Sequence, residues 1–181
     1  MTGAVARRYA KAVFALAKDA GTLQPTADQL ARLAAIASDP TVGPVLRSPL
    51  LSAARRHDLA QTLSRELTLS ELLAHFIQLL ADHQRLGELP AIADRYQQLL
   101  DTELGRVRIT IRSASPLDAT QEADIVAVFA RLTGKQVITS LLVDTGLLGG
   151  VIVEVEGTVY DGSVRTQLDR LAKELSGAAS L

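Results

Sequence analysis

The first 104 residues place apolar side chains at every third or fourth position, which is the spacing of one face of an α-helix. Gly21, Asp39-Pro40, Pro49, Gly87 and Gly105 interrupt this pattern, and such residues are typical of helix ends and loops. The segments between them predict about six helices joined by short loops. Because each helix must bury an apolar face against a neighbour, residues 1–104 are expected to form a six-helix bundle.

Polar side chains mark three of the expected helix starts. Thr26 followed by Gln29, and Thr68 followed by Glu71, match the capping box, in which two side chains satisfy free backbone N–H groups. Ser52 is a further residue of the type that caps a helix. We therefore expect helices to begin at these three positions.

At Arg106 the apolar spacing changes to every second position. Val107, Ile109 and Ile111 alternate with polar residues, which predicts a half-buried strand. A helix from about residue 120 follows, then strands over residues 137–143, 151–156 and 158–160, and a last helix capped by Asp161 or Ser163. The expected fold is α+β, with a helical domain over residues 1–104 and a small strand–helix–strand–strand–strand–helix domain over residues 105–181.

Composition narrows the class of protein. Of the 181 residues, 48% are hydrophobic and 22% are charged, as in folded globular chains. The net charge is −1, the first 104 residues hold eleven basic and eleven acidic side chains, and only 3% of residues are aromatic, which argues against a nucleic-acid surface. The chain has no cysteine, which excludes disulfides and cysteine-bound metals. No apolar run reaches the roughly 18 residues of a membrane-spanning helix.

No group of residues matches a catalytic or metal-binding pattern. The glycine-rich segment 146–150 is followed by strand-like residues and not by the lysine and hydroxyl residue of a phosphate-binding loop. The three histidines lack a ligand spacing, and Glu154 and Glu156 are expected on a solvated strand face. The sequence therefore predicts no catalytic residue, no cofactor and no metal ion.

The first and fifth expected helices carry more apolar surface than one buried stripe requires. Phe14 lies off the main apolar line of its helix, on a face that it shares with Arg7 and Lys11, and the segment from Leu69 to Leu80 is apolar on nearly all sides. Such a helix is either central in its own bundle or covered by a partner. A groove that receives an amphipathic helix of another chain is therefore one of two open interpretations.

Two stretches of sequence point to a family. The opening Val5-Ala6-Arg7-Arg8-Tyr9-Ala10-Lys11-Ala12-Val13-Phe14 is one, and the combination of residues 143–153, Tyr160-Asp161-Gly162-Ser163-Val164-Arg165 and Leu168-Asp169-Arg170-Leu171 is the other. Together with the length and the two-part layout, these resemble the delta-subunit family of bacterial F-type ATP synthases. Its mitochondrial relative is the oligomycin-sensitivity-conferring protein.

The resemblance implies a non-catalytic stator in the peripheral stalk of a membrane-bound, proton-translocating complex. The helical domain would receive the N-terminal helix of an alpha subunit of the catalytic head, and the candidate residues are Tyr9, Val13, Phe14, Leu73, Phe76, Ile77 and Leu80. The C-terminal domain would meet b-type stalk subunits, with Gly149, Gly150, Asp161, Val164, Leu168 and Leu171 as candidates. The resemblance implies a peripheral position on the cytoplasmic face of the bacterial inner membrane, without insertion into the lipid.

Two other functions remain open from the sequence. A helical domain of this size also resembles RNA-binding antitermination adaptors of the NusB type, although the balanced charges of the first 104 residues argue against a basic RNA surface. A small enzyme would need a pocket with converging polar groups, which the sequence does not offer.

Overall fold

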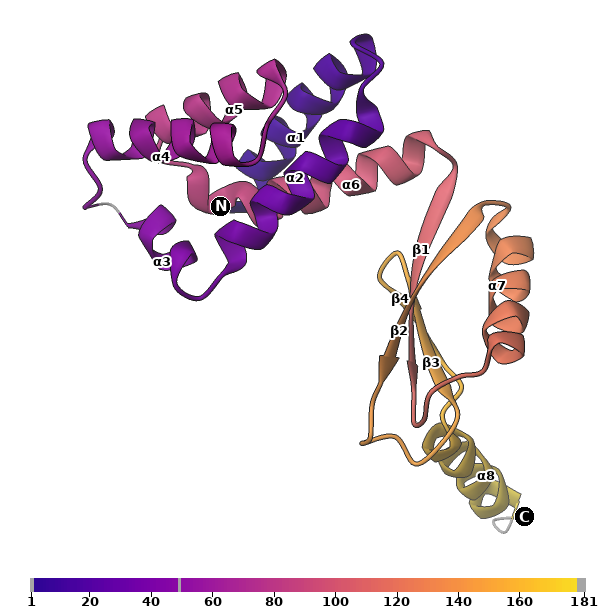
Figure 1. The fold of residues 1–181 in the computed structure, drawn as a ribbon. Coiled ribbons are helices and arrows are strands. Elements are labelled where there is room, and N and C mark those ends of the chain that lie inside the picture. The colour runs from indigo at the N-terminus through magenta and orange to yellow at the C-terminus, as the bar shows by residue number, and fades with distance from the viewer. Residues whose placement is uncertain (1, 49, 179–181) are drawn as a thin grey trace. The chain divides into compact units, whose positions relative to one another are not determined.

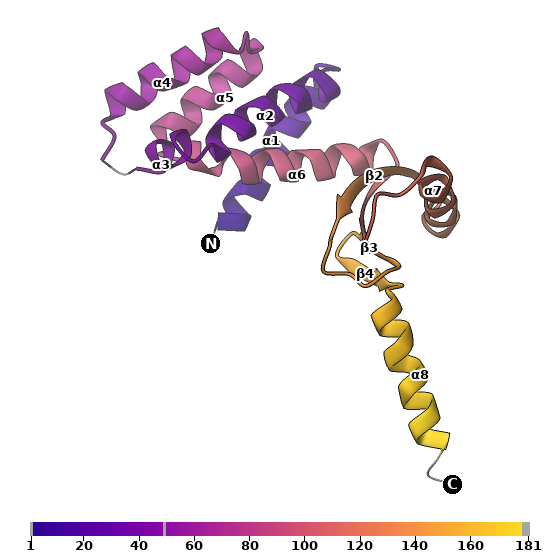
Figure 2. The ribbon, with the colours of Figure 1, turned by 60° about the horizontal axis from the view of Figure 1, so that its bottom comes forward.

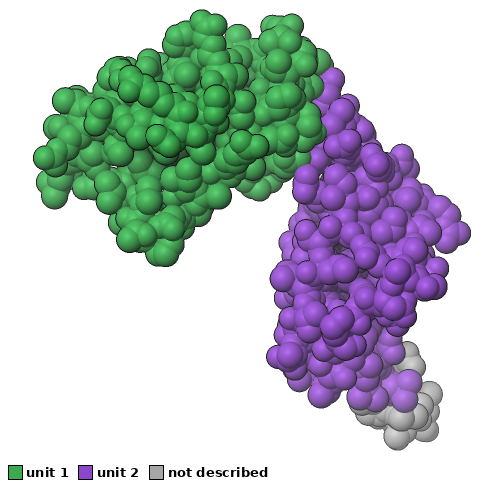
Figure 3. Space-filling view, viewed as in Figure 1, with its two compact units in different colours: residues 1–100 green, residues 101–181 purple. Residues whose placement is uncertain are grey.

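The computed structural model describes residues 2–48 and 50–178. The chain divides into two compact units, Met1–Leu100 (unit 1) and Asp101–Leu181 (unit 2), which Figure 3 shows in green and purple. Unit 1 is helical and unit 2 contains the sheet, so the predicted α+β fold class is confirmed.

Unit 1 is a bundle of helices (Figure 1). Its elements are α1 (Thr2–Asp19), α2 (Leu23–Ser38), α3 (Val42–Arg47), α4 (Ala53–Glu66), α5 (Glu71–Asp82), the 3₁₀ turn η1 (Leu86–Glu88) and α6 (Leu89–Glu103), whose last residues belong to unit 2. The core is built from small residues of α1, such as Ala6 and Ala10, against large ones of α5 and α6, such as Leu80 and Tyr96. Small side chains on α1 allow its neighbours to approach closely, which explains the alanine-rich start of the sequence.

Two of the three predicted helix starts are wrong. Thr26 lies buried in the first turn of α2, which begins four residues earlier after Thr22, so no capping box forms there. Thr68 has a φ of 50° and lies in the turn after α4, and Ser70 is the N-cap of α5. In both cases the matching Ser/Thr-x-x-Glu/Gln spacing arises by chance beside the true boundary. Ser52 is confirmed, because its side chain accepts a hydrogen bond from the backbone N–H of Arg55.

Unit 2 is a four-stranded sheet with two helices. Its elements are β1 (Arg106–Ser113), α7 (Ala119–Thr133), β2 (Gln136–Val143), β3 (Val151–Val155), β4 (Thr158–Asp161) and α8 (Val164–Ala178). The strand order is β2-β1-β3-β4, with β1 parallel to β2 and antiparallel to β3. The connection from β1 through α7 to β2 is a crossover unit, which places α7 on one face of the sheet (Figure 1).

The core of unit 2 lies between α7 and the sheet. Val107, Ile109 and Ile111 of β1 are buried on the face that Phe129 of α7 covers. Asp118 starts α7 with a capping box, since its side chain accepts from the backbone N–H of Gln121 and the Gln121 side chain accepts from that of Asp118. This cap was missed by the sequence pattern, which placed the helix start at about residue 120, one residue after the observed start at Ala119.

The β3–β4 hairpin agrees with the sequence. Glu156 and Gly157 form its two-residue turn with φ values of 47° and 86°, which is the backbone conformation that a type I′ turn needs. Glu156 therefore lies in the turn and not on the strand face where it was expected, and its carboxylate lies 3.2 Å from the Lys135 ammonium group. Glu154 remains on β3 as an exposed strand residue.

The last helix, α8, leaves the end of the sheet and does not pack along it (Figure 2). Its start is fixed by Ser163, whose hydroxyl accepts from the backbone N–H of Thr166, and by Asp161, which accepts from the backbone N–H of Ser163. Both residues named as alternative caps thus contribute. The described part of α8 consequently presents apolar side chains to solvent.

Candidate partner-binding surfaces

Unit 1 exposes an apolar strip where α1 and α5 meet. Tyr9 of α1 and Phe76 of α5 contact edge to face with ring centroids 6.1 Å apart. Helical spacing places Val5, Ala12 and Leu16 in line with Tyr9, and Leu72 and Leu79 in line with Phe76. Leu16 is 56% exposed and Leu79 is 45% exposed. We call these seven residues the α1/α5 strip.

The seven residues predicted to contact an alpha-subunit helix have different surroundings. The side chains of Val13, Leu73, Ile77 and Leu80 are buried in the core, so a partner could reach them only if the bundle opened. Phe76 is 7% exposed at the edge of the core. Tyr9 and Phe14 are half-buried.

Tyr9 and Phe14 lie on opposite sides of α1. Tyr9 belongs to the strip, whereas the Phe14 ring packs against Tyr96 of α6 at 5.5 Å. The residues that give the strip its exposed apolar surface, Leu16 and Leu79, were not among the predicted site residues. The sequence does contain a signal for them: the apolar spacing of each helix includes positions beside its buried line, and Leu16 and Leu79 occupy such positions.

Unit 2 exposes a second apolar surface on α8. Val164, Leu168 and Leu171 recur at intervals of four and three residues, so they lie on one face of the helix. Leu168 and Leu171 are each 57% exposed. These three residues, which we call the α8 stripe, belong to the predicted stalk-binding set.

The other three members of that set position α8. The backbone carbonyl of Gly149 accepts a hydrogen bond from the N–H of Val164, and Gly150 has a φ of 81°. A Cβ on Gly150 would lie 2.4 Å from the carbonyl oxygen of Gly162. Hydrogen bonds to Asp161 from the Ser163 backbone N–H and from the side chains of Ser163 and Thr166 hold the pKa of its carboxyl below the ordinary value, so Asp161 is ionised at neutral pH. These residues fix the direction of the helix, and the stripe offers the contact surface.

A cleft of about 580 Å³ adjoins α8 within unit 2. It lies between α7 and the β3–β4 side of the sheet, where the rings of Phe129 and Tyr160 contact at 5.3 Å. Most of its lining is apolar, and the charged residues there are Asp124, Asp161 and Arg170. Among the described residues that line the cleft there is no histidine and no paired acid and base of the kind that hydrolytic or proton-transfer catalysis requires.

The second face of the sheet is open. Strand register places Arg106, Arg108, Thr110 and Arg112 of β1 on the side away from α7. The residues in line with them are Gln136, Ile138, Ser140 and Leu142 of β2, Ile152 and Glu154 of β3, and Val159 and Asp161 of β4. Leu142 is 53% exposed and Val159 is 54% exposed. We call these twelve residues the open sheet face.

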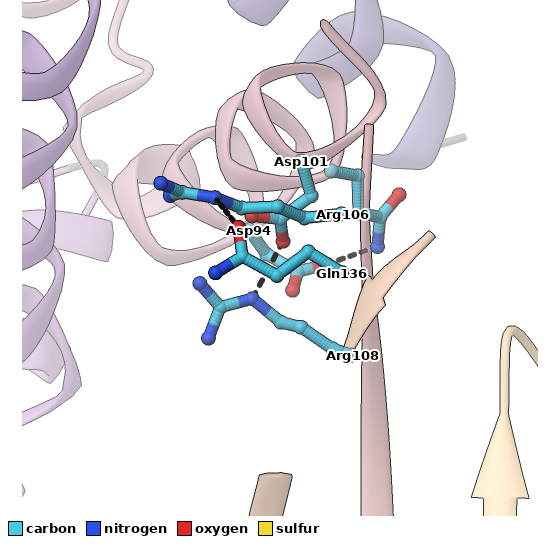
Figure 4. Close-up of polar contacts among 6 residues, drawn as sticks. Asp94, Asp101, Arg106, Arg108 and Gln136 are labelled. Carbon is cyan, nitrogen blue, oxygen red and sulfur yellow. Dashed lines mark hydrogen bonds and ion pairs between the residues drawn. The ribbon is translucent and has the colours of Figure 1, made fainter. Parts of the chain in front are cut away.

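Two of its arginines have partners. The Nε atom of Arg108 lies 2.6 Å from the Asp101 carboxylate at the end of α6, and that of Arg106 lies 3.3 Å from the Gln136 side-chain oxygen (Figure 4). Arg112 is half-buried, and no described residue pairs with its guanidinium. The open sheet face therefore mixes apolar side chains with arginines and with the carboxylates of Glu154 and Asp161.

Residues that could do chemistry are dispersed over both units. Within residues 2–48 and 50–178, no three histidine, aspartate or glutamate side chains gather where a metal ion could bind. The three histidines are all exposed on unit 1. In the same residues, no helix combines the length and the hydropathy that crossing a membrane requires. The α1/α5 strip and the α8 stripe expose apolar side chains, which is typical of surfaces that bind other proteins.

Comparison with known proteins gives the family. The family model for the ATP synthase delta (OSCP) subunit matches residues 5–175. The chain belongs to this family. ATP synthase subunit delta of Anaeromyxobacter dehalogenans is 40% identical over 176 residues, which cover 97% of this chain and 98% of the relative. A delta subunit of Syntrophotalea carbinolica is 41% identical over 174 residues, covering 96% and 97%.

The fold of the delta family is also found in a solved structure. A chain of the mitochondrial ATP synthase hexamer of Toxoplasma gondii superposes with a TM-score of 0.72 at 20% identity, covering 94% of this chain and 96% of that one. This likeness concerns the fold, and it includes both units. The alternative assignment to an RNA-binding antitermination adaptor finds no support in these comparisons.

Proposed function

We propose that this chain, a delta subunit of the peripheral stalk of an F-type ATP synthase, joins the catalytic head to b-type stalk subunits and catalyses no reaction itself. Unit 1 binds the head through the N-terminal helix of an alpha subunit, and unit 2 binds the stalk. The complex then couples rotation to proton-driven ATP synthesis, because the joined head cannot turn with the rotor. The chain is held at the cytoplasmic face of the bacterial inner membrane by its partners.

The observation that best supports the contact between unit 1 and the catalytic head is the α1/α5 strip. An amphipathic helix docks by placing side chains spaced three and four residues apart over an apolar surface. Leu16 and Leu79 offer exposed apolar side chains on either side of the Tyr9–Phe76 contact. Their burial under a partner helix would remove apolar surface from water, which stabilises the complex. The guanidinium of Arg8, 5.6 Å from the centre of the Tyr9 ring, places a cation beside the strip.

The buried residues that the sequence predicted as contacts of the alpha-subunit helix hold the α1/α5 strip in place. Leu73, Ile77 and Leu80 hold α5 against the core, so that Leu72 and Leu79 project from its flank. A rigid support reduces the entropy that is lost when a partner binds. Slow dissociation is what a stator requires, and extended apolar contacts achieve it mainly through the dissociation rate.

We assign the contact between unit 2 and the stalk to the α8 stripe and to the residues that set the direction of α8. The hydrogen bonds to Gly149 and Asp161, together with the close backbone approach at Gly150, set the direction of α8. Val164, Leu168 and Leu171 then form an exposed apolar line along which a helix of a stalk subunit packs.

The substitution Leu79→Asp tests the contact between unit 1 and the alpha-subunit helix. Because Leu79 is exposed, an aspartate there leaves the bundle folded but places a charge in the proposed interface. We expect the affinity for a peptide with the sequence of the alpha-subunit N-terminal helix, measured by titration calorimetry, to fall at least about tenfold.

Val45→Asp on α3 is the matched control, since Val45 is exposed to a similar degree and lies outside the strip. Its affinity for the peptide should equal that of the unmodified chain. Circular dichroism should show the same helix content in both variants. Equal affinity of Leu79→Asp and Val45→Asp would contradict the assignment of the strip.

A further inference from the structure

The two edges of the unit 2 sheet are protected to different degrees. The edge strand β4 is four residues long and ends at Asp161, whose carboxylate is bound by the start of α8. The opposite edge strand, β2, is eight residues long and contains no charged residue, proline or glycine. Natural sheets usually keep an edge short or place lysine or proline on it, because free backbone groups pair readily with another strand. By this measure β2 is an unprotected edge.

The side chains of β2 are exposed on both faces of the sheet. Thr139 contacts Glu122 of α7, so Leu141 and Val143 point to the α7 side, and Leu142 points to the other side. Leu141, Leu142 and Val143 are nevertheless exposed to a similar degree, at 47%, 53% and 54%. A missing cover on one face does not explain this. An open flank does, because each strand of a sheet shields the side chains of its neighbour on both faces.

Two backbone hydrogen bonds show which groups of β2 face outward. The N–H of Gln136, the first residue of the strand, donates to the carbonyl oxygen of Gly105 at 3.0 Å, and the N–H of Asp144, directly after the strand, donates to that of Ser113 at 2.9 Å. Successive strand residues point their N–H and C=O to alternate sides, so the even-numbered residues face β1. The residues whose N–H and C=O point away from the sheet are therefore Val137, Thr139, Leu141 and Val143. In the part of the chain that the structure describes, no strand lies beyond them.

The spacing of these outward groups allows β2 to pair with a second β2. In an antiparallel pair related by a two-fold axis, residues that exchange hydrogen bonds lie opposite one another. If Ser140 lies on the axis, every outward-facing residue from 137 to 143 meets another outward-facing residue. The resulting pairs are Val137 with Val143, Thr139 with Leu141, and, between the hydrogen-bonded pairs, Ile138 with Leu142. An axis at any other residue leaves some of the outward groups opposite residues outside the strand.

We propose that β2 pairs with the β2 strand of a second copy of this chain, antiparallel and with Ser140 on the two-fold axis, so that the two sheets become one. The occupant is a second copy because β2 is self-complementary in its backbone groups and its side chains, and because it carries no charge that would repel an identical strand. The inference does not depend on the proposed function, since it concerns the chain free of head and stalk.

The chain has no cysteine, so a single introduced cysteine tests the register directly. Ser140→Cys places two thiols opposite one another, with Cα atoms about 4.5 Å apart, which a disulfide can span. Val143→Cys is the matched control on the same strand, because its two copies would lie about 20 Å apart. Both native side chains are exposed, so both variants should fold. With diamide as the oxidant, we expect Ser140→Cys to form a covalent dimer at least about tenfold faster than Val143→Cys.

Sedimentation equilibrium of the full chain measures the dimer without a cross-link. Leu141→Pro removes an outward N–H that bonds only in the dimer, and an edge strand tolerates proline at such a position. We expect the dissociation constant of the dimer to rise at least about tenfold, because each copy loses a hydrogen bond. Leu141→Ala keeps the N–H and should weaken the dimer less. Circular dichroism checks that both variants fold, and the cysteine comparison stands without them.

Three results would overturn the inference and leave the proposed function intact. The first is a monomeric chain at every concentration, with equal cross-linking of Ser140→Cys and Val143→Cys. The second is a dimer that persists in Leu141→Pro and is lost in Leu168→Asp, because the contact would then lie on the α8 stripe. The third is protection of the Leu141 amide from hydrogen exchange only after stalk subunits are added, because a segment of the stalk would then be the partner of β2.

Discussion

Among individual residues, Tyr96 shows how one side chain joins three helices of unit 1. Its ring lies in the core on α6 and contacts Phe14 of α1, and its hydroxyl donates a hydrogen bond to the carbonyl oxygen of Leu23 at the start of α2, at 3.0 Å. Burial raises the pKa of Tyr96 to about 12, and a hydrogen bond with Thr26 opposes part of that rise. The phenol is therefore held neutral where an unfolded chain would ionise it.

Replacement of Tyr96 by phenylalanine should separate these effects. At pH 7 the loss of the hydrogen bond is expected to lower the free energy of unfolding by about 1 kcal/mol. Above pH 10 the unfolded tyrosine ionises while the folded one stays neutral up to about 12, so the unmodified chain loses stability with rising pH. Its advantage over Tyr96→Phe should therefore shrink between pH 10 and 12. Urea unfolding of both proteins at pH 7, 10 and 11 measures this, and a constant difference would contradict it.

Residue types alone could not separate the core from the contact surface. Phe76 and Leu79 are both apolar and lie three positions apart on one helix, yet Phe76 is 7% exposed and Leu79 is 45% exposed. Periodicity identifies the apolar sides of a helix, but the position of α1 against Phe76 decides which side is covered.

At the level of elements, the start of α8 depends on a close approach between two glycine-containing turns. Gly150 has a φ of 81°, and an added Cβ would lie 2.4 Å from the carbonyl oxygen of Gly162 and 3.0 Å from the Cα of Ser163. Both atoms belong to the backbone, so neither can move aside without shifting α8. The Gly-Gly sequence before β3 is thus explained by the fixing of a helix and not by phosphate binding.

Gly150→Ala should therefore release α8. We expect a loss of about 1–3 kcal/mol in the free energy of unfolding and faster hydrogen exchange at the Val164 amide, which bonds to Gly149. Gly157→Ala is the control, because Gly157 also has a positive φ of 86° but an added Cβ would meet no atom within 4 Å. It should cost about 1 kcal/mol or less and leave the Val164 amide protected. Equal effects of the two substitutions would exclude a role for the close approach.

The type and order of the elements followed from the sequence, whereas two helix starts did not. Long periodic segments such as α5 and α7 and the hairpin at Glu156-Gly157 were predicted because local spacing determines them. Thr26 and Thr68 both match a capping pattern. Thr26 lies inside α2, four residues after the N-cap Thr22, and Thr68 lies two residues before the N-cap Ser70 of α5. Whether a hydroxyl caps a helix depends on the backbone angles next to it, and several residues in a loop can match the same pattern.

For the whole molecule, each unit combines its own core with exposed apolar surface. Unit 1 carries the α1/α5 strip, and unit 2 carries the α8 stripe. Because the surfaces lie on separate units, we expect that contact with the head and contact with the stalk can each be lost without the other. This independence is our central claim.

Assembly of the chain with purified head and stalk subunits tests that claim most directly. Two variants are compared by co-sedimentation: Leu79→Asp on the α1/α5 strip, and Leu168→Asp on the α8 stripe. Both side chains are exposed, so circular dichroism should show both variants folded. We predict that the first retains the stalk and loses the head, and that the second retains the head and loses the stalk. Folded variants that keep both partners, or that lose both together, would contradict the account.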